Sequence, residues 1–426
     1  MPNVSRTPVA IVLYQHATET ASLRRMRSSL VRGPHVKPLH LDRLDERLAA
    51  HLDGLVVAGN HAWSVCAAAL ERPSVGVIFA ATVCAVADES AGAGINDRLS
   101  QLLALSAALP SSSAGLLSAF GWLEPQRLRG VVAQLLKSDR ASWRSIGIAA
   151  CALHRVDPGL ISARRFEDPD PTVRARAWRT AGELGIRQLV STAAAAASEE
   201  DPGCQFWAAW SAVLLGDKEY ALAAIANAAA APGPLRARAF QLALQAMSTQ
   251  NAHAWLKVLG QDPSNRRWLI RGAGLVGDPT YVPWLIQQMT ELKTTRLAGE
   301  AFSLITGLDL TYLDLEVKPP ENFESGPNDD PDDPNVEMDE DDGLPWPDVS
   351  KIQGWWAANA GRFKAGTRYF MGEPLNRDHC LQVLKGGFQR QRIAAALYLS
   401  LLNPGTPLFN TSAPAPRQKR LLAQMS

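Results

Sequence analysis

The sequence has little of what marks a secreted, metal-binding or strongly charged protein. Only five cysteines occur in 426 residues, and their scattered spacing fits neither a disulfide framework nor a zinc site. The net charge is about +1, which, taken for the whole chain, argues against a nucleic-acid coat or a highly acidic tail protein. Aromatic residues make up 7%, whereas alanine is abundant. Since alanine is the best helix former and lets helices pack closely, we expect an all-α protein in a reducing compartment.

Long apolar runs are also missing. The run from Val9 to Tyr14 is too short to cross a bilayer or to form the core of a signal peptide. The alanine-rich run over 221–231 is interrupted by Asn227 and is typical of a buried helix. We therefore expect a cytoplasmic protein that does not bind a membrane.

The near-neutral charge conceals an uneven distribution. Between Asp314 and Asp342 lie 13 acidic residues and a single basic one, Lys318. Without this segment the chain keeps 42 basic and 29 acidic residues, which gives a net charge of about +13. The segment is rich in Pro, Asp, Asn and Gly and cannot bury enough surface to fold by itself, so it is predicted to be a loop.

A period of about 31 residues governs the middle of the chain. Asp-Pro pairs recur, and each is followed at a constant distance by a glycine: Pro171 by Gly185, Pro202 by Gly216, and Pro263 by Gly277. The hexapeptide VRARAW at 173–178 returns as LRARAF at 235–240. Weaker copies begin at Ser138 and Glu291, which gives about six units.

Each unit has the pattern of a helical hairpin. The Asp caps the free amides at the start of a helix, and Pro suits its first turn. Apolar positions follow at helical spacing, as at Val173, Ala177, Ala181 and Leu184. A glycine then ends the helix where a positive φ is needed. Two helices in a repeat of this length are typical of a solenoid, in which each unit buries its apolar stripe against its neighbours.

The units resemble short HEAT repeats, although Gln205 stands where an Arg is expected. More specifically, the chain is similar to a family of bacterial HEAT-like proteins. The resemblance rests on LDRLDERLAAHLDGLVVAG at 41–59, AACALHRVDPG at 149–159, GDPTYVPWLIQQM at 277–289, LAGEAFSLITGLDL at 297–310, LPWPDVSKIQGWW at 344–356, GTRYFMGEPL at 366–375 and QRQRIAAALYLSLLNPGTPLF at 389–409. Members are commonly encoded among type VI secretion effector genes, beside spike and adaptor proteins. The resemblance implies an accessory role and supplies neither a reaction nor catalytic residues.

The predicted fold is an all-α solenoid of HEAT-like helical hairpins with an acidic loop insertion and a C-terminal helical cap. We expect an N-terminal segment and helix over 1–60, irregular helical hairpins over 61–137, HEAT-like repeats over 138–310, the acidic Pro/Asp-rich loop over 311–348, the cap over 349–402 and a flexible tail over 403–426.

Three sequence patterns could indicate a cofactor or metal site, but the predicted structure around each of them does not fit such a site. The segment from Gly272 to Gly277 fits G-x-G-x-x-G, but it lies at the end of a predicted repeat helix rather than after a strand. The acidic run lacks the glycine of a calcium-binding EF-hand loop, with Met338 at its first position. His379 and Cys380 are adjacent on a predicted helix and point apart. We therefore expect no catalytic residue, no cofactor and no metal.

Arginines recur at similar positions of the units, and two interpretations remain open. Stacked units would place them in a ladder. They could bridge to the Asp of the neighbouring Asp-Pro pair, or form a basic stripe for an acidic partner. The residues are Arg174, Arg176, Arg236, Arg238, Arg266, Arg267, Arg271 and Arg296.

A basic stripe could bind nucleic acid, the acidic segment of the chain itself or an acidic protein. The tryptophans near the stripe are either base-stacking platforms or core residues: Trp143, Trp178, Trp207, Trp210 and Trp268. A tethered acidic segment would compete with nucleic acid at high effective concentration, which favours protein binding.

The acidic segment is either a solvated linker or a lid over the stripe. The candidate lid residues are Asp329, Asp330, Asp332, Asp333, Asp339, Asp341 and Asp342, and the candidate anchors that follow are Trp346, Trp355 and Trp356. The function expected from these features is a non-enzymatic, cytoplasmic scaffold, adaptor or chaperone-like protein. Its expected partner is a type VI secretion effector or its spike complex. The alternative is a DNA-binding protein that resembles the HEAT-like DNA glycosylases, and a bilin lyase of this fold has no support beyond the repeat.

Overall fold

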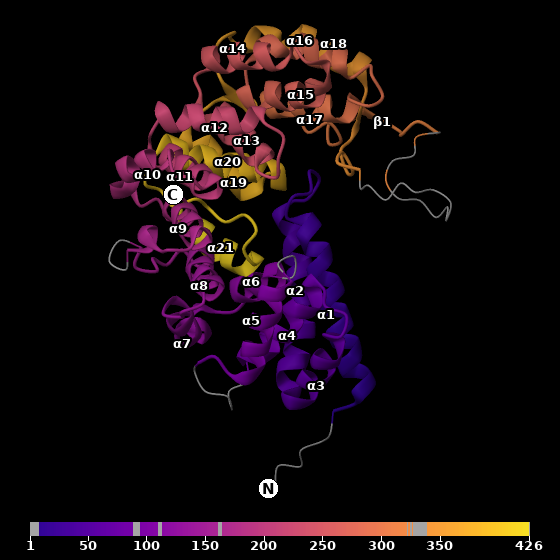
Figure 1. The fold of residues 1–426 in the computed structure, drawn as a ribbon. Helices are drawn as coiled ribbons and strands as arrows, with labels where there is room; N and C mark the ends of the chain where they lie inside the picture. The colour runs from indigo at the N-terminus through magenta and orange to yellow at the C-terminus, as the bar shows by residue number, and fades with distance from the viewer. Residues whose placement is uncertain are drawn as a thin grey trace. The chain divides into compact units, whose positions relative to one another are not determined.

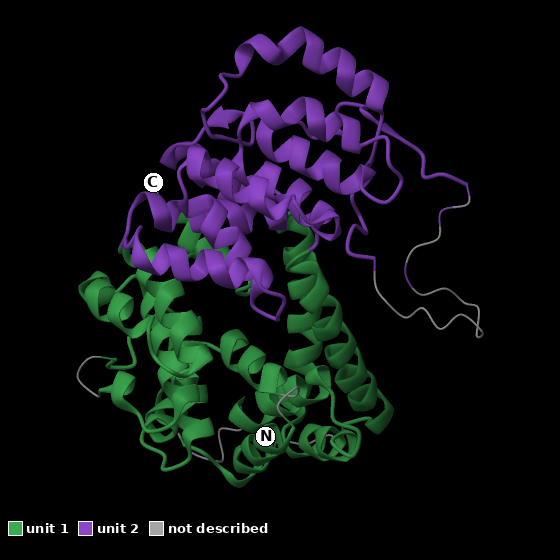
Figure 2. Ribbon diagram, turned by 45° about the horizontal axis from the view of Figure 1, so that its top comes forward, with its two compact units in different colours: residues 1–32, 36–215, 405–426 green, residues 33–35, 216–404 purple. Residues whose placement is uncertain are grey.

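The computed structural model describes residues 8–87, 94–109, 113–160, 164–321, 323, 326 and 339–425. These residues form 21 α-helices and four strands of two residues each, so the fold is an all-α solenoid of helical hairpins, as predicted (Figure 1). The chain divides into two compact units (Figure 2). Unit 1 comprises residues 1–32, 36–215 and 405–426, and unit 2 comprises residues 33–35 and 216–404.

Unit 1 begins with helices of irregular arrangement. They are α1 (Ala10–Leu30), α2 (Pro38–Ala58), α3 (Asn60–Ala69), α4 (Val75–Ala87), α5 (Asp97–Ala108), α6 (Ser113–Trp122) and α7 (Pro125–Leu136). The sequence predicted a single helix within 1–60, whereas the structure has two there, α1 and α2. The buried positions of α1 include Thr20 and Arg27, which break the apolar pattern of its stripe. The core of this part of unit 1 is centred on residues such as Leu48, Phe79 and Phe120.

The repeats begin in unit 1 and continue in unit 2. In unit 1 they are α8 (Ala141–Leu153), a 3-10 turn η3 (Arg165–Glu167), α9 (Pro171–Leu184), η4 (Arg187–Leu189), α10 (Val190–Ala196) and α11 (Pro202–Leu215). In unit 2 they are α12 (Tyr220–Ala230), α13 (Arg236–Ala246), α14 (Thr249–Leu259), η5 (Pro263–Asn265), α15 (Arg266–Val276), η6 (Pro279–Tyr281), α16 (Val282–Gln288) and α17 (Thr295–Thr306). The first helices of the hairpins therefore start 29 to 34 residues apart.

Glycines end the first helices of the hairpins where the sequence placed them. Gly185, Gly277 and Gly307 have φ values of 68°, 72° and 76°. This left-handed conformation is easy for glycine and strained for residues with a Cβ. At Gly277 and Gly307 the space for a Cβ is also taken, by the carbonyl oxygens of Tyr369 and Met371.

The C-terminal cap completes unit 2. It consists of α18 (Val349–Asn359), η7 (Ala360–Arg362), β3 (Tyr369–Phe370) paired with β4 (Glu373–Pro374), α19 (Arg377–Gly386) and α20 (Gln389–Leu402). Before it, the acidic segment over 311–348 is not entirely a loop, because β1 (Glu316–Val317) pairs with β2 (Trp346–Pro347). The β3–β4 hairpin seals the ends of two repeat helices, because the backbone N–H of Tyr369 donates to Gly277 and that of Gly372 donates to Ile305. The cap joins α15–α17 around Phe302 in one core.

Residues 403–426 are not the flexible tail that the sequence predicted. They include α21 (Ala415–Ala423), which packs on α2 within unit 1. The backbone N–H of Ala415 donates to the carboxylate of Asp45, and Arg27 donates to the carbonyl oxygens of Ser412 and Ala413. These long-range bonds order a segment whose own composition is polar and proline-rich. No helix in the described part of the chain is long and apolar enough to cross a bilayer.

Candidate functional site

The repeat arginines fall into two sets, because Arg174 and Arg176 belong to unit 1 and the other six belong to unit 2. Arg174, on α9, is paired with Glu199, with 3.3 Å between Nε and a carboxylate oxygen. Arg144 occupies the corresponding place on α8 and pairs with Asp168 at 2.7 Å. Each of these two ion pairs therefore joins the first helix of one repeat to the segment just before the first helix of the next repeat.

The acids of the ladder are not the ones that sequence reasoning suggested. Asp168 and Glu199 each lie two residues before the Asp of an Asp-Pro pair. The Asp-Pro carboxylates are engaged elsewhere: Asp170 accepts from the N–H of Thr172 and Asp201 accepts from the N–H of Cys204, both at 2.8 Å. An Asp that caps its own helix has satisfied the free amides of that helix. The ladder therefore uses separate acids.

Arg176 is also bound inside unit 1. Its guanidinium donates to Thr180 and to the carboxylate of Glu183 on the same helix. In unit 2, Arg236 donates to Asn265 and lies over the ring of Trp268, while Arg266 donates to Gln288. These contacts join neighbouring helices of the repeat.

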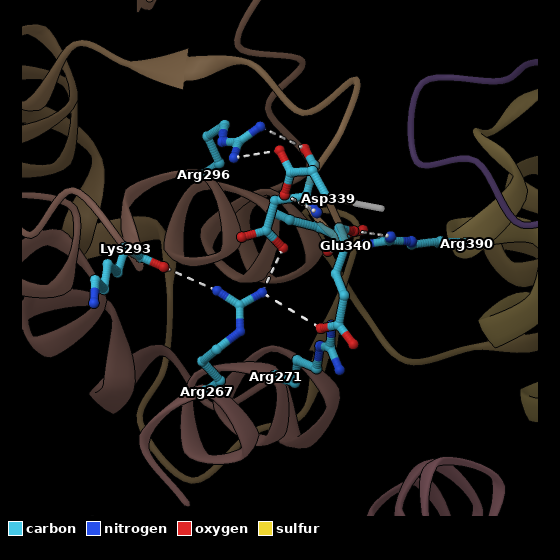
Figure 3. A network of polar contacts seen from close by, with 9 residues as sticks. Arg267, Arg271, Lys293, Arg296, Asp339, Glu340 and Arg390 are labelled. Atoms are coloured by element: carbon cyan, nitrogen blue, oxygen red, sulfur yellow. Dashed lines mark hydrogen bonds and ion pairs between the residues drawn. The ribbon is translucent and has the colours of Figure 1, made fainter. Parts of the chain in front are cut away.

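A different arrangement surrounds the last part of the acidic segment. Four arginines from three helices converge on residues 339–341: Arg267 and Arg271 from α15, Arg296 from α17 and Arg390 from α20 (Figure 3). We call these four residues the arginine cluster, and residues 339–341 the acidic strap. Both lie in unit 2.

Each acid of the strap has its own arginine. Asp339 pairs with Arg296, Glu340 with Arg271, and Asp341 with Arg267, in each case with 2.7 Å between nitrogen and oxygen (Figure 3). Charged hydrogen bonds of this length are about twice as strong as neutral ones. The cluster therefore recognises three consecutive carboxylates individually.

The backbone of the strap is bound as well as its side chains. Arg390 donates to the carbonyl oxygen of Glu340 at 2.8 Å, and Arg296 donates to that of Asp341 at 3.1 Å. Arg390 also pairs with Glu300 of α17. The strap is therefore held through its backbone carbonyls as well as through its carboxylates.

Burial differs along the strap. The side chain of Asp341 is 5% exposed and that of Asp339 is 15% exposed, whereas that of Glu340 is 65% exposed. Arg271 is the largest influence on Glu340 and holds the pKa of its carboxyl below the usual value. Burial raises the pKa of Glu300, against the opposing influence of Arg390. Two anchored acids thus flank one that faces solvent.

Some of these residues were singled out from the sequence, and others were not. The stripe and lid residues Arg267, Arg271, Arg296, Asp339 and Asp341 lie in the site. Asp342 follows the strap and is exposed, whereas Asp329, Asp330, Asp332 and Asp333 lie outside the described residues. The sequence reasoning missed Glu340 because it considered only aspartates, and Arg390 because that residue lies in the cap. Arg238 lies on α13 and is exposed.

The tryptophans after the strap belong to unit 2. Trp346 is buried, and its ring and that of Phe323 both lie within 5 Å of the Arg296 guanidinium, at 4.8 and 4.9 Å. Trp355 and Trp356 pack with Phe363 at the edge of the core around Phe302. Trp346 thereby stabilises the arginine that binds Asp339.

The tryptophans near the repeat arginines are buried or partly buried. Trp178 and Trp210 are buried in unit 1, so they are core residues rather than base-stacking platforms. Trp143, Trp207 and Trp268 are partly buried beneath arginines of their own units, namely Arg140, Arg179 and Arg236.

The G-x-G-x-x-G segment lies at the end of α15, and Gly277 is the residue that ends this helix. The segment therefore forms the last turns of a helix and does not follow a strand, as phosphate binding by this motif requires. Cys380 is buried in α19. Among the described residues, no group of three or more His, Cys, Asp or Glu side chains could hold a metal ion.

Comparison with protein families supports the repeat assignment. A family model described as HEAT repeats matches residues 158–245, which run from the end of the α8 unit to α13. No curated protein matches the chain. This part of the chain therefore has HEAT-like character, in agreement with the hairpins described above.

Proposed function

We propose that the protein is a non-enzymatic scaffold that binds a protein partner, and that the arginine cluster of unit 2 recognises an acidic segment of that partner. One observation carries the proposal: the cluster already binds three consecutive acids, Asp339 to Asp341, through side chains and backbone. HEAT repeats and other solenoids commonly serve as protein-interaction surfaces, which supports the same conclusion.

In this proposal the acidic strap is a lid, an internal ligand that a partner displaces. Glu340 offers the starting point, because its side chain is 65% exposed and an incoming acid could compete first for Arg271. A tethered segment competes at high effective concentration, so a partner must present several acids at once. The strap would thereby select against weakly acidic proteins.

The resemblance found in the sequence supports a narrower proposal for the partner. We place it among type VI secretion effectors and their spike or adaptor proteins, and the protein itself in the cytoplasm. Nucleic acid has less support as a ligand. Two of the tryptophans that could stack on bases, Trp178 and Trp210, are buried.

Binding experiments with strap and cluster variants test the proposal. The strap variant carries Asp339→Asn, Glu340→Gln and Asp341→Asn together, and the cluster variant carries Arg267→Gln and Arg271→Gln. A labelled peptide that contains Asp-Glu-Asp is titrated against each. The strap variant should bind at least about tenfold more tightly than the wild type, because its internal competitor has lost its charges. The cluster variant should bind no peptide.

The matched control is Lys257→Ala, an exposed cation of α14 in the same unit. It should leave binding unchanged. Equal peptide affinity in the wild type and both variants would refute the proposal. For the narrower proposal, the protein is co-expressed with the products of neighbouring genes, and failure to co-purify with any of them would exclude that partner class. The strap variant is also titrated with duplex DNA. A higher affinity for duplex DNA than for the labelled peptide would favour the nucleic-acid alternative.

A further inference from the structure

Unit 1 contains a pocket that the arginine cluster does not involve. It lies between the first halves of α9 and α11 and has a volume of about 340 Å³. Small-molecule sites in proteins usually range from about 300 to 1,000 Å³, so the pocket suits a small group. Its lining consists of Pro171, Thr172, Ala175, Arg176 and Arg179 from α9, and Asp201, Gly203 and Trp207 from the start of α11.

Two guanidinium groups line this pocket with donors to spare. The Nε atom of Arg179 donates to Glu183 at 2.9 Å, and the guanidinium lies 4.6 Å from the ring centre of Trp207. Neither terminal nitrogen of Arg179 has an acceptor among the described residues, and the same is true of Nη1 of Arg176. A guanidinium offers five donors, so each of these side chains can still bind an oxygen ligand.

Glu183 fixes both arginines in place. Its carboxylate accepts from Arg176 and from Arg179, and its side chain is only 12% exposed. Burial alone would raise the pKa of this carboxyl, but Arg176, Arg179 and Arg155 lower it to about 2. Arg155 is held in turn by the carbonyl oxygen of Leu408. A site whose donors are positioned before a ligand arrives loses less conformational entropy on binding.

The charges around the pocket favour an anion with one negative charge. Arg176 and Arg179 of the lining, together with the nearby Arg155, act on the buried carboxylate of Glu183, and with Asp201 included these five groups leave a net charge of about +1. Asp201 lines the opposite wall and caps α11 through its bond to the N–H of Cys204. Its charge opposes a phosphate dianion more than a carboxylate. The planar carboxylate also matches the fork of a guanidinium, and the ring of Trp207 and the side chain of Ala175 supply apolar surface beside it.

We propose that this pocket is a binding site for the carboxylate of an organic acid, with Arg179 as the main donor, Arg176 as the second, and Trp207 beside the apolar part of the ligand. The carboxylate could belong to a free acid or to the C-terminus of a peptide. This site is independent of the arginine cluster, since all its residues lie in unit 1.

The test uses the full chain and four probes: phenylacetate, a hexapeptide ending in Phe with a free carboxylate, the same peptide as its C-terminal amide, and inorganic phosphate. Binding is followed by calorimetry and by NMR of the probes. If phenylacetate binds and the peptide acid does not, the natural ligand is a free organic acid. If the peptide acid binds more tightly than phenylacetate, the natural ligand is the C-terminus of a peptide. The amide should not bind.

Variants assign the binding to the pocket. Arg179→Ala should weaken carboxylate binding at least about tenfold, because a charge-assisted hydrogen bond pair is lost. Arg179→Lys keeps the charge and serves where the alanine variant does not fold; it should also bind more weakly, since an ammonium cannot form the fork. Arg187→Ala removes an exposed arginine of the same unit that does not line the pocket, and should bind as the wild type does. The proposal is overturned if no carboxylate binds, if phosphate or the amide binds as tightly, or if Arg187→Ala weakens binding as much as Arg179→Ala.

Discussion

A terminal nitrogen of Arg296 lies 2.7 Å from a carboxylate oxygen of Asp339, although 43 residues separate them in the sequence. Both side chains are largely buried, at 9% and 15% exposure. Water therefore cannot replace either partner fully, and the pair holds the acidic strap on α17. The strap thus contributes to the stability of unit 2 as well as occupying the arginine cluster.

Substitution of a buried strap residue should destabilise unit 2. Asp341→Ala removes the 2.7 Å pair with Arg267, which keeps a longer, 3.6 Å pair with the exposed Glu340. We expect a loss of about 1–3 kcal/mol, measured by urea unfolding, because a short charged hydrogen bond to a carboxylate that is only 5% exposed is lost. Asp342→Ala removes the same charge from the next, exposed residue and should change stability by less than about 0.5 kcal/mol. Equal effects of the two substitutions would show that the strap is only a linker.

Two glycines allow a sharp comparison of backbone requirements. Gly277→Ala should destabilise by about 2 kcal/mol or more, because φ is 72° there and the new Cβ would collide with the carbonyl oxygen of Tyr369. Gly354→Ala, within α18, meets nothing within 4 Å and should instead stabilise by up to about 1 kcal/mol. Thermal unfolding of both variants measures this difference. A mild effect at Gly277 would mean that the β3–β4 hairpin does not seal α15 as described.

Unit 1 should lose stability in acid through Glu183. The pKa of this carboxyl is about 2 in the folded chain, below its ordinary value of 4.5. A carboxyl whose pKa is lowered by folding stabilises the folded state fully above its unfolded pKa, and this contribution disappears as the pH falls through the folded pKa. We expect up to about 3 kcal/mol to be lost between roughly pH 5 and pH 2.

Glu183→Gln should flatten this dependence, since the substituted side chain does not titrate. The control is Glu167→Gln, because the side chain of Glu167 is 65% exposed. Its curve of unfolding free energy against pH should run parallel to that of the wild type. A wild-type slope that persists in Glu183→Gln would place the acid sensitivity elsewhere.

Removal of the C-terminal segment should destabilise unit 1. A chain that ends after residue 409 lacks Ser412, Ala413 and Ala415, which bind Arg27 and Asp45. We expect a loss of about 2–4 kcal/mol, because several buried hydrogen bonds to charged groups disappear together. Lys419→Ala breaks the ion pair between Lys419 and Asp42, in which the lysine side chain is 66% exposed. This substitution should lower the free energy of unfolding by less than about 1 kcal/mol. If the truncated chain unfolds at the same temperature as the wild type, the C-terminal segment does not stabilise unit 1.

The repeats could be predicted because their signals are local. Asp170 caps α9 through the N–H of Thr172, only two residues away, and Gly185 ends the helix through its own φ. Such features recur every 31 residues or so and need no knowledge of the rest of the fold. The helices α18 and α20 also lie within the range 349–402 that was expected to form the cap.

The parts that were missed depend on contacts between distant residues. Arg27 lies in the buried stripe of α1, and its role follows only from Asp45 and from the carbonyl groups of the C-terminal segment. Gln418 of α21 is buried because Thr411 and Ala413 accept from its amide. Arg390 joins the arginine cluster because it donates to the carbonyl oxygen of Glu340, which lies 50 residues earlier. A local pattern cannot show such pairings.

The inclusion of residues 405–426 in unit 1 has a consequence for how the protein is synthesised. The ribosome makes residues 216–404, which form nearly all of unit 2, before it makes the segment that completes unit 1. Until residue 415 has been added, Asp45 lacks the backbone N–H that it accepts from in the folded chain. The first unit to emerge is therefore the last to be finished, because α21, which packs on α2, is missing throughout translation of unit 2.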